Sequence, residues 1–304
     1  MTGIIQSDVL KTAVLDRCGV ELDVILHKII DSTNDWSFRQ CSAGRKLPFA
    51  CFAENQIRGK GRRGKHWLMS PDTNIAMSLT WSFVLPCQSL RLLSLSVAMA
   101  IVKTLEAINI KDVQIKWPND VYVSGKKIAG ILIETRPLKA GAKSEQTAES
   151  SVKDFITVVI GVGLNYDMRD MIDLRSGTGS QTGEPLPEFT DVCRERGVQL
   201  TGDFLQDVNR SSVAEELLNQ LVMVCQHYQN DTSYYLDEFQ KKYDYCLYKN
   251  VDIIQDNGEV VSGVAQGVNE NAELLVRING ENSASEHRVF NSAEVSVKPG
   301  EINL

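Results

Sequence analysis

Residues 155–166, FITVVIGVGLNY, are apolar at almost every position. A run of this kind is typical of a β-strand that is buried on both faces, so the chain must fold around it. The longest helical pattern, in residues 89–110, repeats apolar side chains at helical spacing, with Leu93, Val97 and Ile101 among them. It predicts a central buried helix. The larger part of the chain therefore combines buried strand with buried helix.

Shorter patterns predict the neighbouring elements. The segment ELDVILHKII begins as a strand and meets DSTND, where Ser32 followed by Asp35 fits the start of a helix. Further strands are expected at residues 47–56 and 73–85, and as a hairpin of 121–123 with 128–133. Further helices are expected at 203–208, 211–228 and 232–245. Two polar stretches, near 136–154 and 174–190, are predicted to be loops.

The character of the sequence changes near residue 249. Short apolar runs follow, separated by the turn sequences DNGE, NENAE and NGEN, and Asn-Gly between apolar runs is a strong hairpin signal. The pattern predicts a small all-β domain of SH3-like form. We therefore expect two domains, residues 1–248 and residues 249–304.

The composition argues against several classes of protein. The net charge of −7 argues against general nucleic-acid binding, which usually shows as a basic domain. The seven cysteines form no C-x-x-C pair and the four histidines lie far apart, so we expect reduced thiols and no protein-bound metal. No run reaches the roughly 18 apolar residues of a membrane helix, and the N-terminus lacks the pattern of a secretory signal. We expect a cytoplasmic protein with no membrane partner.

Residues 58–67, RGKGRRGKHW, which we call the basic loop, are an exception to the acidic charge, with five Lys or Arg and three Gly. The spacing of Gly59, Gly61 and Gly64 matches a dinucleotide-binding turn, but strand-like residues follow where a helix must begin. A nucleoside-triphosphate loop would need Ser or Thr at His66 to hold magnesium. The His-Arg-Asp and Asp-Phe-Gly sequences of protein kinases are absent. None of these motif matches therefore holds.

Two interpretations of the basic loop remain. One is a solvated charged loop, or a patch that contacts nucleic-acid phosphates. The other is a loop that closes over a phosphorylated small molecule, because glycine permits close backbone approach and arginine stabilises developing charge. Ordering such a chain costs entropy, so in the second interpretation the loop orders when the ligand binds.

Three further stretches bear on this choice. KWPNDVYVSGKKIAG places Lys127 at the mouth of a buried hairpin, where a cation is costly without an anionic partner, whereas Lys126 flanks the strand in solvent. GVGLN ends the buried strand with two glycines and Asn165, either as a bulge or as a place where the backbone approaches a planar ring. Ser32, Thr33 and Asn34 are either ligand contacts or only a helix cap.

Taken in order, DSTND, AENQIRGKGRRGKHW, KWPNDVYVSGKKIAGILIE and GVGLN closely resemble the biotin–protein ligases. The resemblance covers residues from about 25 to 170, with a weaker match in the C-terminal β domain. It implies an α+β fold: a catalytic domain with a mixed β-sheet and helices, related to the class II aminoacyl-tRNA synthetases, and a small SH3-like β-barrel. It also implies two half-reactions. Biotin and ATP give biotinyl-5′-AMP and pyrophosphate, and the adenylate then acylates one lysine of a biotin carboxyl-carrier domain.

Matching positions with the family implies a role for each residue of these motifs. Contacts to biotin are expected from Ser32, Thr33, Asn34, Gln56, Lys60, Gly61, Arg62, Lys127 and Gly130. Contacts to ATP or the adenylate are expected from Arg62, Arg63, Lys65, Trp67, Asn119, Leu164 and Asn165. The expected catalytic residues are Lys127, Arg62 and Asp120. Lys60 departs from the family, which usually has Arg there, and Lys cannot make the planar two-pronged contact.

The chemistry of the implied reaction agrees with these residue types. A carboxylate that attacks an α-phosphate brings two anions together, and cations such as Lys127 and Arg62 reduce their repulsion. Magnesium offsets the charge of the departing pyrophosphate. The acceptor lysine must be neutral to attack, and with a pKa of about 10.4 only on the order of one in a thousand is neutral at pH 7. Our hypothesis is that Asp120 takes its proton.

Three alternatives remain. A lipoate–protein ligase performs the same two steps on a different acid. A non-catalytic biotin sensor is a second alternative, against which the intact Lys127 and arginine pair argue. A nucleic-acid-binding protein is a third, against which the net charge argues. Too few residues precede the first expected strand for a winged-helix DNA-binding domain, so no repressor role is expected. The sequence does not indicate the oligomeric state.

Overall fold

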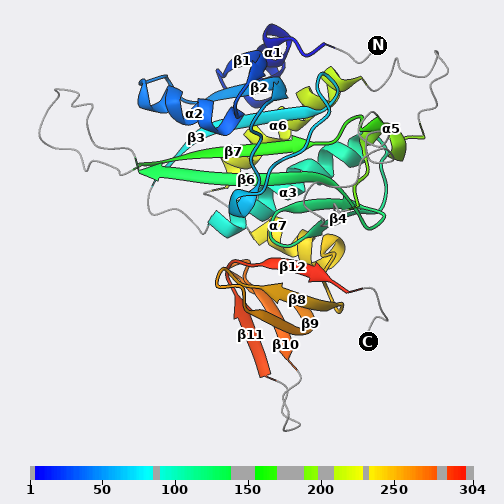
Figure 1. Ribbon diagram of the computed structural model, residues 1–304. Helices are drawn as coiled ribbons and strands as arrows, with labels where there is room; N and C mark the ends of the chain where they lie inside the picture. The colour runs from blue at the N-terminus through cyan, green and yellow to red at the C-terminus, as the bar shows by residue number, and fades with distance from the viewer. Residues whose placement is uncertain are drawn as a thin grey trace, which may run out of the picture.

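The computed structural model describes residues 4–84, 90–137, 155–169, 188–197, 209–228, 233–278 and 286–298. The two expected polar loops lie mostly outside these residues, and the helix expected at 203–208 lies wholly outside them. The two lobes of the described chain are the larger N-terminal part and a smaller C-terminal sheet below it (Figure 1).

The larger part is built on a seven-stranded sheet with the strand order β1-β2-β3-β7-β6-β5-β4. Its strands are β1 (Asp23–Ile30), β2 (Phe49–Gln56), β3 (Ile75–Val84), β4 (Val113–Lys116), β5 (Asp120–Val123), β6 (Lys126–Pro137) and β7 (Phe155–Leu164). β1 runs parallel to β2, and every other neighbouring pair is antiparallel. The expected mixed sheet is therefore confirmed, and the apolar run at 155–166 forms its middle strand.

Helices cover both faces of this sheet unequally. α1 (Ser7–Cys18), α3 (Leu90–Ala107) and α6 (Arg210–His227) pack side by side on one face, and α7 (Ser233–Glu238) continues there into a short π-helix, η2 (Phe239–Tyr243). α2 (Thr33–Ser42) lies on the opposite face, against β2, β3 and β7 (Figure 1). The short α5 (Val192–Glu195) and the one-turn η1 (Arg62–Gly64) lie in connections. The sequence did not predict α1, β4 or α5.

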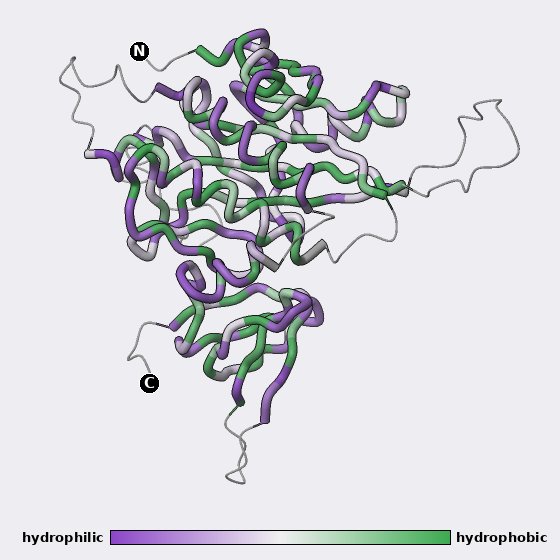
Figure 2. The backbone as a smooth tube through the Cα atoms, turned by 180° about the vertical axis from the view of Figure 1, so that it is seen from behind, coloured by the Kyte–Doolittle hydropathy of each residue, from purple (hydrophilic) through white to green (hydrophobic). Residues whose placement is uncertain are grey.

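The core lies between the sheet and α3 with α6. Met77 and Leu79 of β3 are buried on the side of these helices, and so is Ile160 of β7. Val97 of α3 is also fully buried, as the helical pattern predicted. The tube coloured by hydropathy shows the same concentration of apolar residues in the central strands and helices (Figure 2).

The opposite face of the sheet carries polar residues and glycines, and we call it the site face. Side chains alternate between faces along a strand, so the residues between those of the core point this way. Ser78 of β3 pairs with Gly161 of β7, and Gly163 of β7 pairs with Gly130 of β6. Because three of these four residues lack a side chain, other groups can lie directly on the strands.

The C-terminal part is a separate five-stranded antiparallel sheet with the order β11-β10-β9-β8-β12. Its strands are β8 (Asn250–Ile254), β9 (Val260–Val268), β10 (Leu274–Ile278), β11 (Glu286–Phe290) and β12 (Glu294–Val297). The expected small β domain is confirmed. Its SH3-like form and the division between residues 248 and 249 stay predictions. Trp117 joins the two parts, because its Nε1–H donates to Ala272 O at 2.9 Å.

Two expectations drawn from composition concern the whole chain. The six described cysteines are free thiols, and four of them are buried, as expected. Among the helices that the structure describes, none is long and apolar enough to cross a membrane.

Candidate active site

The N-terminus of α2 brings charged groups to the site face. Ser32 is the N-cap, and its side chain accepts a hydrogen bond from Asp35 N, as the sequence predicted. The preceding Asp31 accepts two hydrogen bonds from Arg39, both of 2.8 Å. These hydrogen bonds lower the pKa of Asp31 to about 2. The carboxylate therefore stays ionised and fixes the turn that begins α2.

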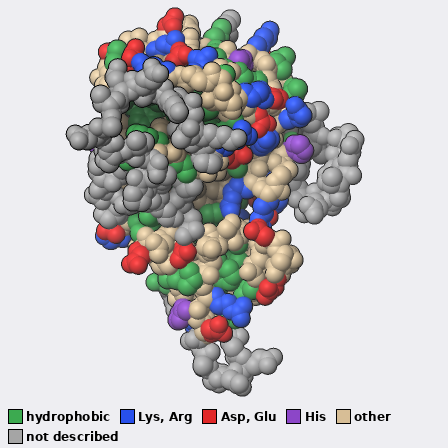
Figure 3. Space-filling view, turned by 90° about the vertical axis from the view of Figure 1, so that its left-hand side faces the viewer, with side chains coloured by type: hydrophobic (Ala, Val, Ile, Leu, Met, Phe, Trp, Pro, Cys, Tyr) green, Lys and Arg blue, Asp and Glu red, His purple; other side chains and the backbone are tan. Residues whose placement is uncertain are grey.

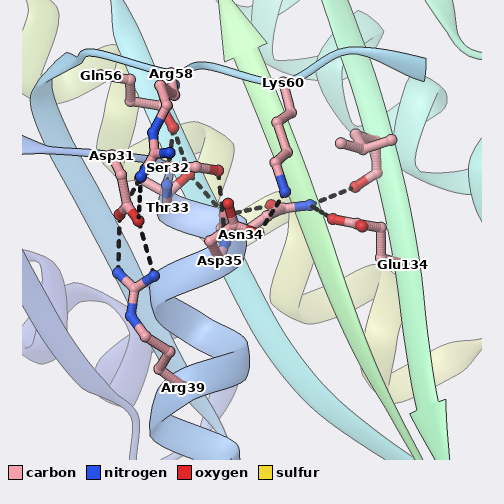
Figure 4. Close-up of polar contacts among 12 residues, drawn as sticks. Asp31, Ser32, Thr33, Asn34, Asp35, Arg39, Gln56, Arg58, Lys60 and Glu134 are labelled. Carbon is pink, nitrogen blue, oxygen red and sulfur yellow. Dashed lines mark hydrogen bonds and ion pairs between the residues drawn. The ribbon is translucent and has the colours of Figure 1, made fainter. Parts of the chain in front are cut away.

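A buried polar network follows the cap (Figure 4). The Thr33 N–H donates to Gln56 Oε1 at 2.8 Å. Ser78 Oγ lies 2.6 Å from Asn34 Oδ1 and 2.8 Å from Thr33 Oγ1. Asn34 Nδ2 donates to Glu134 Oε2 at 2.8 Å. Three strands and one helix thus place these groups together, and the groups nearest Gln56 are uncharged donors and acceptors, which suit an uncharged polar ligand group.

The basic loop forms a small hairpin between β2 and β3. Gly61 N donates to Lys65 O at 2.7 Å, and Trp67 N donates to Gly59 O at 3.0 Å. From the end of β2 the connection crosses in front of β7 and β6 (Figure 1). The hypothesis that the loop orders on ligand binding stays a prediction.

The indole of Trp67 lies directly on the glycines of the site face. A Cβ atom added to Gly163 would lie 2.3 Å from Trp67 Cε2, and one added to Gly130 would lie 2.9 Å from Trp67 Cζ3. Lys127 Nζ lies 5.5 Å from the centre of a Trp67 ring. Of the two readings of GVGLN, a bulge or a close approach to a planar ring, the structure shows the second at Gly163, where the ring is that of Trp67, and this ring also covers Gly130, where we expected biotin.

Two polar pairs gather beside Trp67. Arg62 Nη1 donates to Asn119 Oδ1 at 3.2 Å, and Asn119 Nδ2 donates to Ile131 O at 2.7 Å. Lys127 Nζ lies 2.7 Å from Asp120 Oδ1, and both side chains are about four-fifths buried. Burial lowers the pKa of Arg62, although the group keeps its charge at neutral pH. The site thus holds two cations against one carboxylate, which favours binding of an anion.

The cations of the basic loop also reach the C-terminal sheet. Three contacts, which we call the loop–sheet pairs, join Arg62 Nη2 to Ser292 Oγ (3.0 Å), Arg63 Nη2 to Asp256 Oδ1 (2.6 Å) and Lys65 Nζ to Glu294 Oε1 (2.5 Å). Lys and Arg side chains gather with acidic ones where the two parts of the molecule meet (Figure 3). Arg63 and Lys65, expected as nucleotide contacts, are thus ion-paired with the C-terminal part.

The GVGLN segment contributes one of its two expected residues. Asn165 Nδ2 donates to Thr190 O at 3.1 Å, and Asn165 Oδ1 is buried with no hydrogen-bond partner among the described residues. Leu164 is fully buried in the core and alternates in direction with Gly163. The structure therefore does not bring the Leu164 side chain to the site.

One group among the described residues has the composition of a metal site. Ligand atoms of Asp167, Asp191 and Cys193 lie within 4.8 Å of one another and all three residues are buried. However, Arg169 donates to both oxygens of Asp167. The charge of that carboxylate is already compensated, so the cluster does not fit a resident magnesium ion, which prefers free oxygen ligands.

All the expected site residues except Leu164 gather on the site face or in the basic loop. Lys60 is held by Asp35, with 2.6 Å between Nζ and Oδ1. The sequence analysis missed four participants: Asp35, Ser78, Glu134 and Glu294. Ser78 and Glu134 left little signal, since each stands in a strand that holds other polar residues, such as Thr80 in β3 and Arg136 in β6. Nothing local in the sequence marks Glu294.

Comparisons with known proteins agree with this geometry. Residues 26–150 match the model of the "Biotin/lipoate A/B protein ligase family". The bifunctional ligase/repressor BirA of Salmonella typhimurium is 28% identical over 269 residues, which cover 87% of this chain and 73% of the relative. A biotin–[acetyl-CoA-carboxylase] ligase of Mycobacterium tuberculosis is 24% identical over 265 residues, covering 86% and 84%.

A solved structure has the same fold. The biotin protein ligase from Aquifex aeolicus in complex with biotin and ATP superposes with a TM-score of 0.61 at 21% identity, over 90% of this chain and 98% of that one. The motifs, the arrangement of the strands and these matches agree: over residues 26–150 the chain is similar to the biotin/lipoate A/B protein ligase family, and its fold is that of the Aquifex aeolicus structure.

Proposed function

We propose that the protein is an ATP-dependent biotin–protein ligase. It activates biotin as biotinyl-5′-AMP and transfers biotin to one lysine of a biotin carboxyl-carrier domain, in carboxylases of the acetyl-CoA carboxylase type. Support for the carrier comes from the Mycobacterium tuberculosis relative, which is a biotin–[acetyl-CoA-carboxylase] ligase. We place the activity in the cytoplasm and name ATP, as its magnesium complex, and biotin as the substrates.

One observation carries this proposal: a cluster of uncharged polar side chains and a cationic group lie next to each other on the site face. Asn34 lies against Gly161 of β7, and two residues further along, Trp67 lies against Gly163. Lys127 is beside that indole. An acid with an uncharged polar head would place its carboxylate near Lys127 if the head lay at Asn34.

The cationic end supports the first half-reaction. A carboxylate oxygen of biotin attacks the α-phosphorus of ATP, a new O–P bond forms, and the bond to pyrophosphate breaks. Lys127 and Arg62 reduce the repulsion between the two anions and stabilise the charge on the phosphorus centre. Magnesium leaves with the pyrophosphate and offsets its charge.

Asp120 supports the second half-reaction. The amine of the acceptor lysine attacks the acyl carbon of the adenylate, the C–N bond forms, and AMP leaves. The amine must lose a proton, and a nearby carboxylate is a suitable acceptor. Since Asp120 Oδ1 is bonded to Lys127, we assign the proton to Asp120 Oδ2.

The test is calorimetric titration with biotin, followed by addition of ATP and magnesium with detection of pyrophosphate. We expect biotin to bind and pyrophosphate to appear only when ATP is added. Lys127→Met should abolish pyrophosphate release, whereas Lys126→Met, the matched change one residue earlier, should leave it intact. If the protein bound lipoate and not biotin, its similarity to the family would stand, but the assignment of biotin as the substrate would be wrong.

A further inference from the structure

The orientation of the Asn34 amide is fixed by two groups that only accept hydrogen bonds. Asn34 Nδ2 donates to Glu134 Oε2 at 2.8 Å and to Leu132 O at 3.3 Å. A carboxylate and a backbone carbonyl have no proton to donate, so the amide nitrogen must face them. Asn34 Oδ1 therefore faces Ser78. Glu134 supplies the shorter and charge-assisted bond of the two, and it determines this orientation.

The direction of the next hydrogen bonds follows from that orientation. Asn34 Oδ1 can only accept, so the single hydroxyl proton of Ser78, 2.6 Å away, points to it. Thr33 Oγ1 lies 2.8 Å from Ser78 Oγ and 3.1 Å from Gln56 Oε1. Since the proton of Ser78 is already committed, Thr33 must direct its own proton to one of these two oxygens. Its lone pairs then remain free to accept.

Gln56 is oriented by the backbone. The Thr33 N–H donates to Gln56 Oε1 at 2.8 Å, so Gln56 Nε2 is the donor end of the amide; one of its two protons faces Met69 Sδ at 3.9 Å, and the other is left to donate. The network therefore offers one acceptor, Thr33 Oγ1, beside one donor, Gln56 Nε2. A cyclic urea needs this combination, because it presents an N–H group next to a carbonyl oxygen.

The space around Asn34 leaves little freedom for another arrangement. Only 3% of the residue is exposed. A Cβ atom added to Gly161 would lie 2.3 Å from Asn34 Oδ1, so the amide fills the space above this glycine. Rotation of the amide by half a turn would place its oxygen against Glu134, and two acceptors in contact repel each other.

We propose that Glu134 is a positioning residue that sets the hydrogen-bond polarity of the ligand pocket, through Asn34, Ser78 and Thr33, and so selects the ureido group of biotin. This inference rests on the proposed function, because it assumes that the ureido group lies at Thr33 and Gln56. Glu134 itself acts through Asn34.

The experiment compares Glu134→Met with Glu134→Gln. Met has a similar length but cannot accept the bond from Asn34, and we expect the Kd and KM of biotin to rise about tenfold with kcat unchanged. Gln can still present a carbonyl oxygen to Asn34, and we expect its values to stay within about twofold of those of the unmodified protein. Glu286→Met, the same change on an exposed strand position, is the control.

Selectivity provides a readout that loss of structure alone would not change. In iminobiotin a C=NH group replaces the ureido carbonyl, so the analogue presents a donor towards Gln56 Nε2. We expect the unmodified protein to prefer biotin, and Glu134→Met to lose most of this preference. Equal weakening of both ligands would show a structural role only and would overturn the proposal.

The outcomes also separate this inference from the proposed function. If the unmodified protein binds no biotin, the function is wrong and the inference fails with it. If the unmodified protein and Glu134→Met bind biotin with the same Kd, the function stands and the role of Glu134 is refuted. The same conclusion follows if Glu134→Gln loses as much affinity as Glu134→Met.

Discussion

At the scale of single residues, each cation of the site has an acidic or polar partner in the protein. Lys60 is paired with Asp35 and Lys127 with Asp120. Lys127 is largely buried, and a buried charge without a partner is costly, so Asp120 allows this cation to be present before an anionic substrate arrives. A phosphate or carboxylate that binds here competes with the protein's own acids. Substitution of Asp35 or Asp120 should therefore change the rate of the reaction as well as the affinity for the substrates.

Asp120→Asn tests the assignment of the base. It keeps the size of the side chain but removes the group that accepts the proton of the acceptor lysine. We expect transfer from preformed biotinyl-5′-AMP to fall by about two to three orders of magnitude, with a smaller effect on adenylate formation. Single-turnover transfer to a carrier domain measures this step directly. A normal transfer rate in the variant would remove Asp120 from the mechanism.

Arg62→Gly tests retention of the intermediate. The change removes the contacts of Arg62 with Asn119 and Ser292, and with them the cation that the loop places beside Asn119. We expect the bound adenylate to dissociate at least tenfold faster and then to label lysines of unrelated proteins. Gel filtration of the adenylate complex measures the dissociation. Arg58→Gly, at an exposed residue of the same loop, should behave like the unmodified protein.

At the scale of strands and helices, glycine determines how closely other groups approach the sheet. Gly161 and Gly163 stand on the site face of β7, and their lack of side chains makes room for Asn34 and Trp67. On the other face of the same strand, Ile160 and Leu164 are fully buried core residues. One strand thus supplies both the core and the surface on which the site is built.

Gly163→Ala tests this use of glycine. The new methyl group would lie 2.3 Å from the Trp67 indole, so the ring and the basic loop must move. We expect the KM of ATP to rise about tenfold, with little loss of thermal stability because the contacts of the core are unchanged. A second change, Trp67→Phe, shortens the ring and should recover part of the loss. An unchanged KM in Gly163→Ala would mean that Trp67 has no part in the site.

The sequence predicted the elements whose signal is local. The apolar run of β7, the pattern of α3 and the cap at Ser32 were all confirmed. α1 was missed because it buries only Leu10 and Val14 and has no clear apolar stripe. β4 was missed because four residues are too few to show alternation.

The site was less predictable because many of its contacts join residues that are far apart in the sequence. Asn34 meets Glu134 across one hundred residues, and Lys65 meets Glu294 across more than two hundred. Glu134 stands at the end of the KWPNDVYVSGKKIAGILIE motif, but the resemblance gave it no role, and Glu294 lies outside the motifs. The burial of Leu164 was predictable from alternation with Gly163, but the motif resemblance pointed to the site instead.

At the scale of the whole molecule, the junction between the two parts contains a buried acid. Asp244 pairs with Ile115 of β4, and its Oδ1 accepts from Cys246 N at 2.8 Å. Its Oδ2 is buried without a partner among the described residues, although part of the residue reaches solvent. Burial raises the pKa of Asp244 to about 6.

This raised pKa makes a prediction about stability. The folded protein holds the proton of Asp244 more tightly than the unfolded chain, so the free energy of unfolding falls as the pH rises through about 4 to 6. Asp244→Asn cannot ionise and should lack this contribution, which is about 2–3 kcal/mol. Urea unfolding of both proteins between pH 4 and pH 7 measures the difference. If the free energies of unfolding of the two proteins differed by the same amount at every pH, Asp244 would have an ordinary pKa.

The loop–sheet pairs connect the C-terminal part to the chemistry. Lys65 was expected to contact the nucleotide, but in the structure it pairs with Glu294 of β12. Burial would raise the pKa of Glu294, but the hydrogen bond from Lys65 and the nearby positive charges outweigh it and lower this pKa. Both side chains remain partly exposed, so the pair should contribute little to the stability of the fold. Its effect should be on the position of the basic loop.

An exchange of the two charges separates these roles of Lys65. If the residue holds the loop through Glu294, then Lys65→Glu and Glu294→Lys should each raise the KM of ATP severalfold, and the double variant should recover most of the loss. If Lys65 instead contacts a phosphate, the double variant keeps a carboxylate at position 65 and stays as poor as Lys65→Glu. We expect recovery, because the only partner that the structure gives the Lys65 side chain within the described residues is Glu294. The C-terminal sheet would then act on catalysis by fixing the loop that carries Arg62.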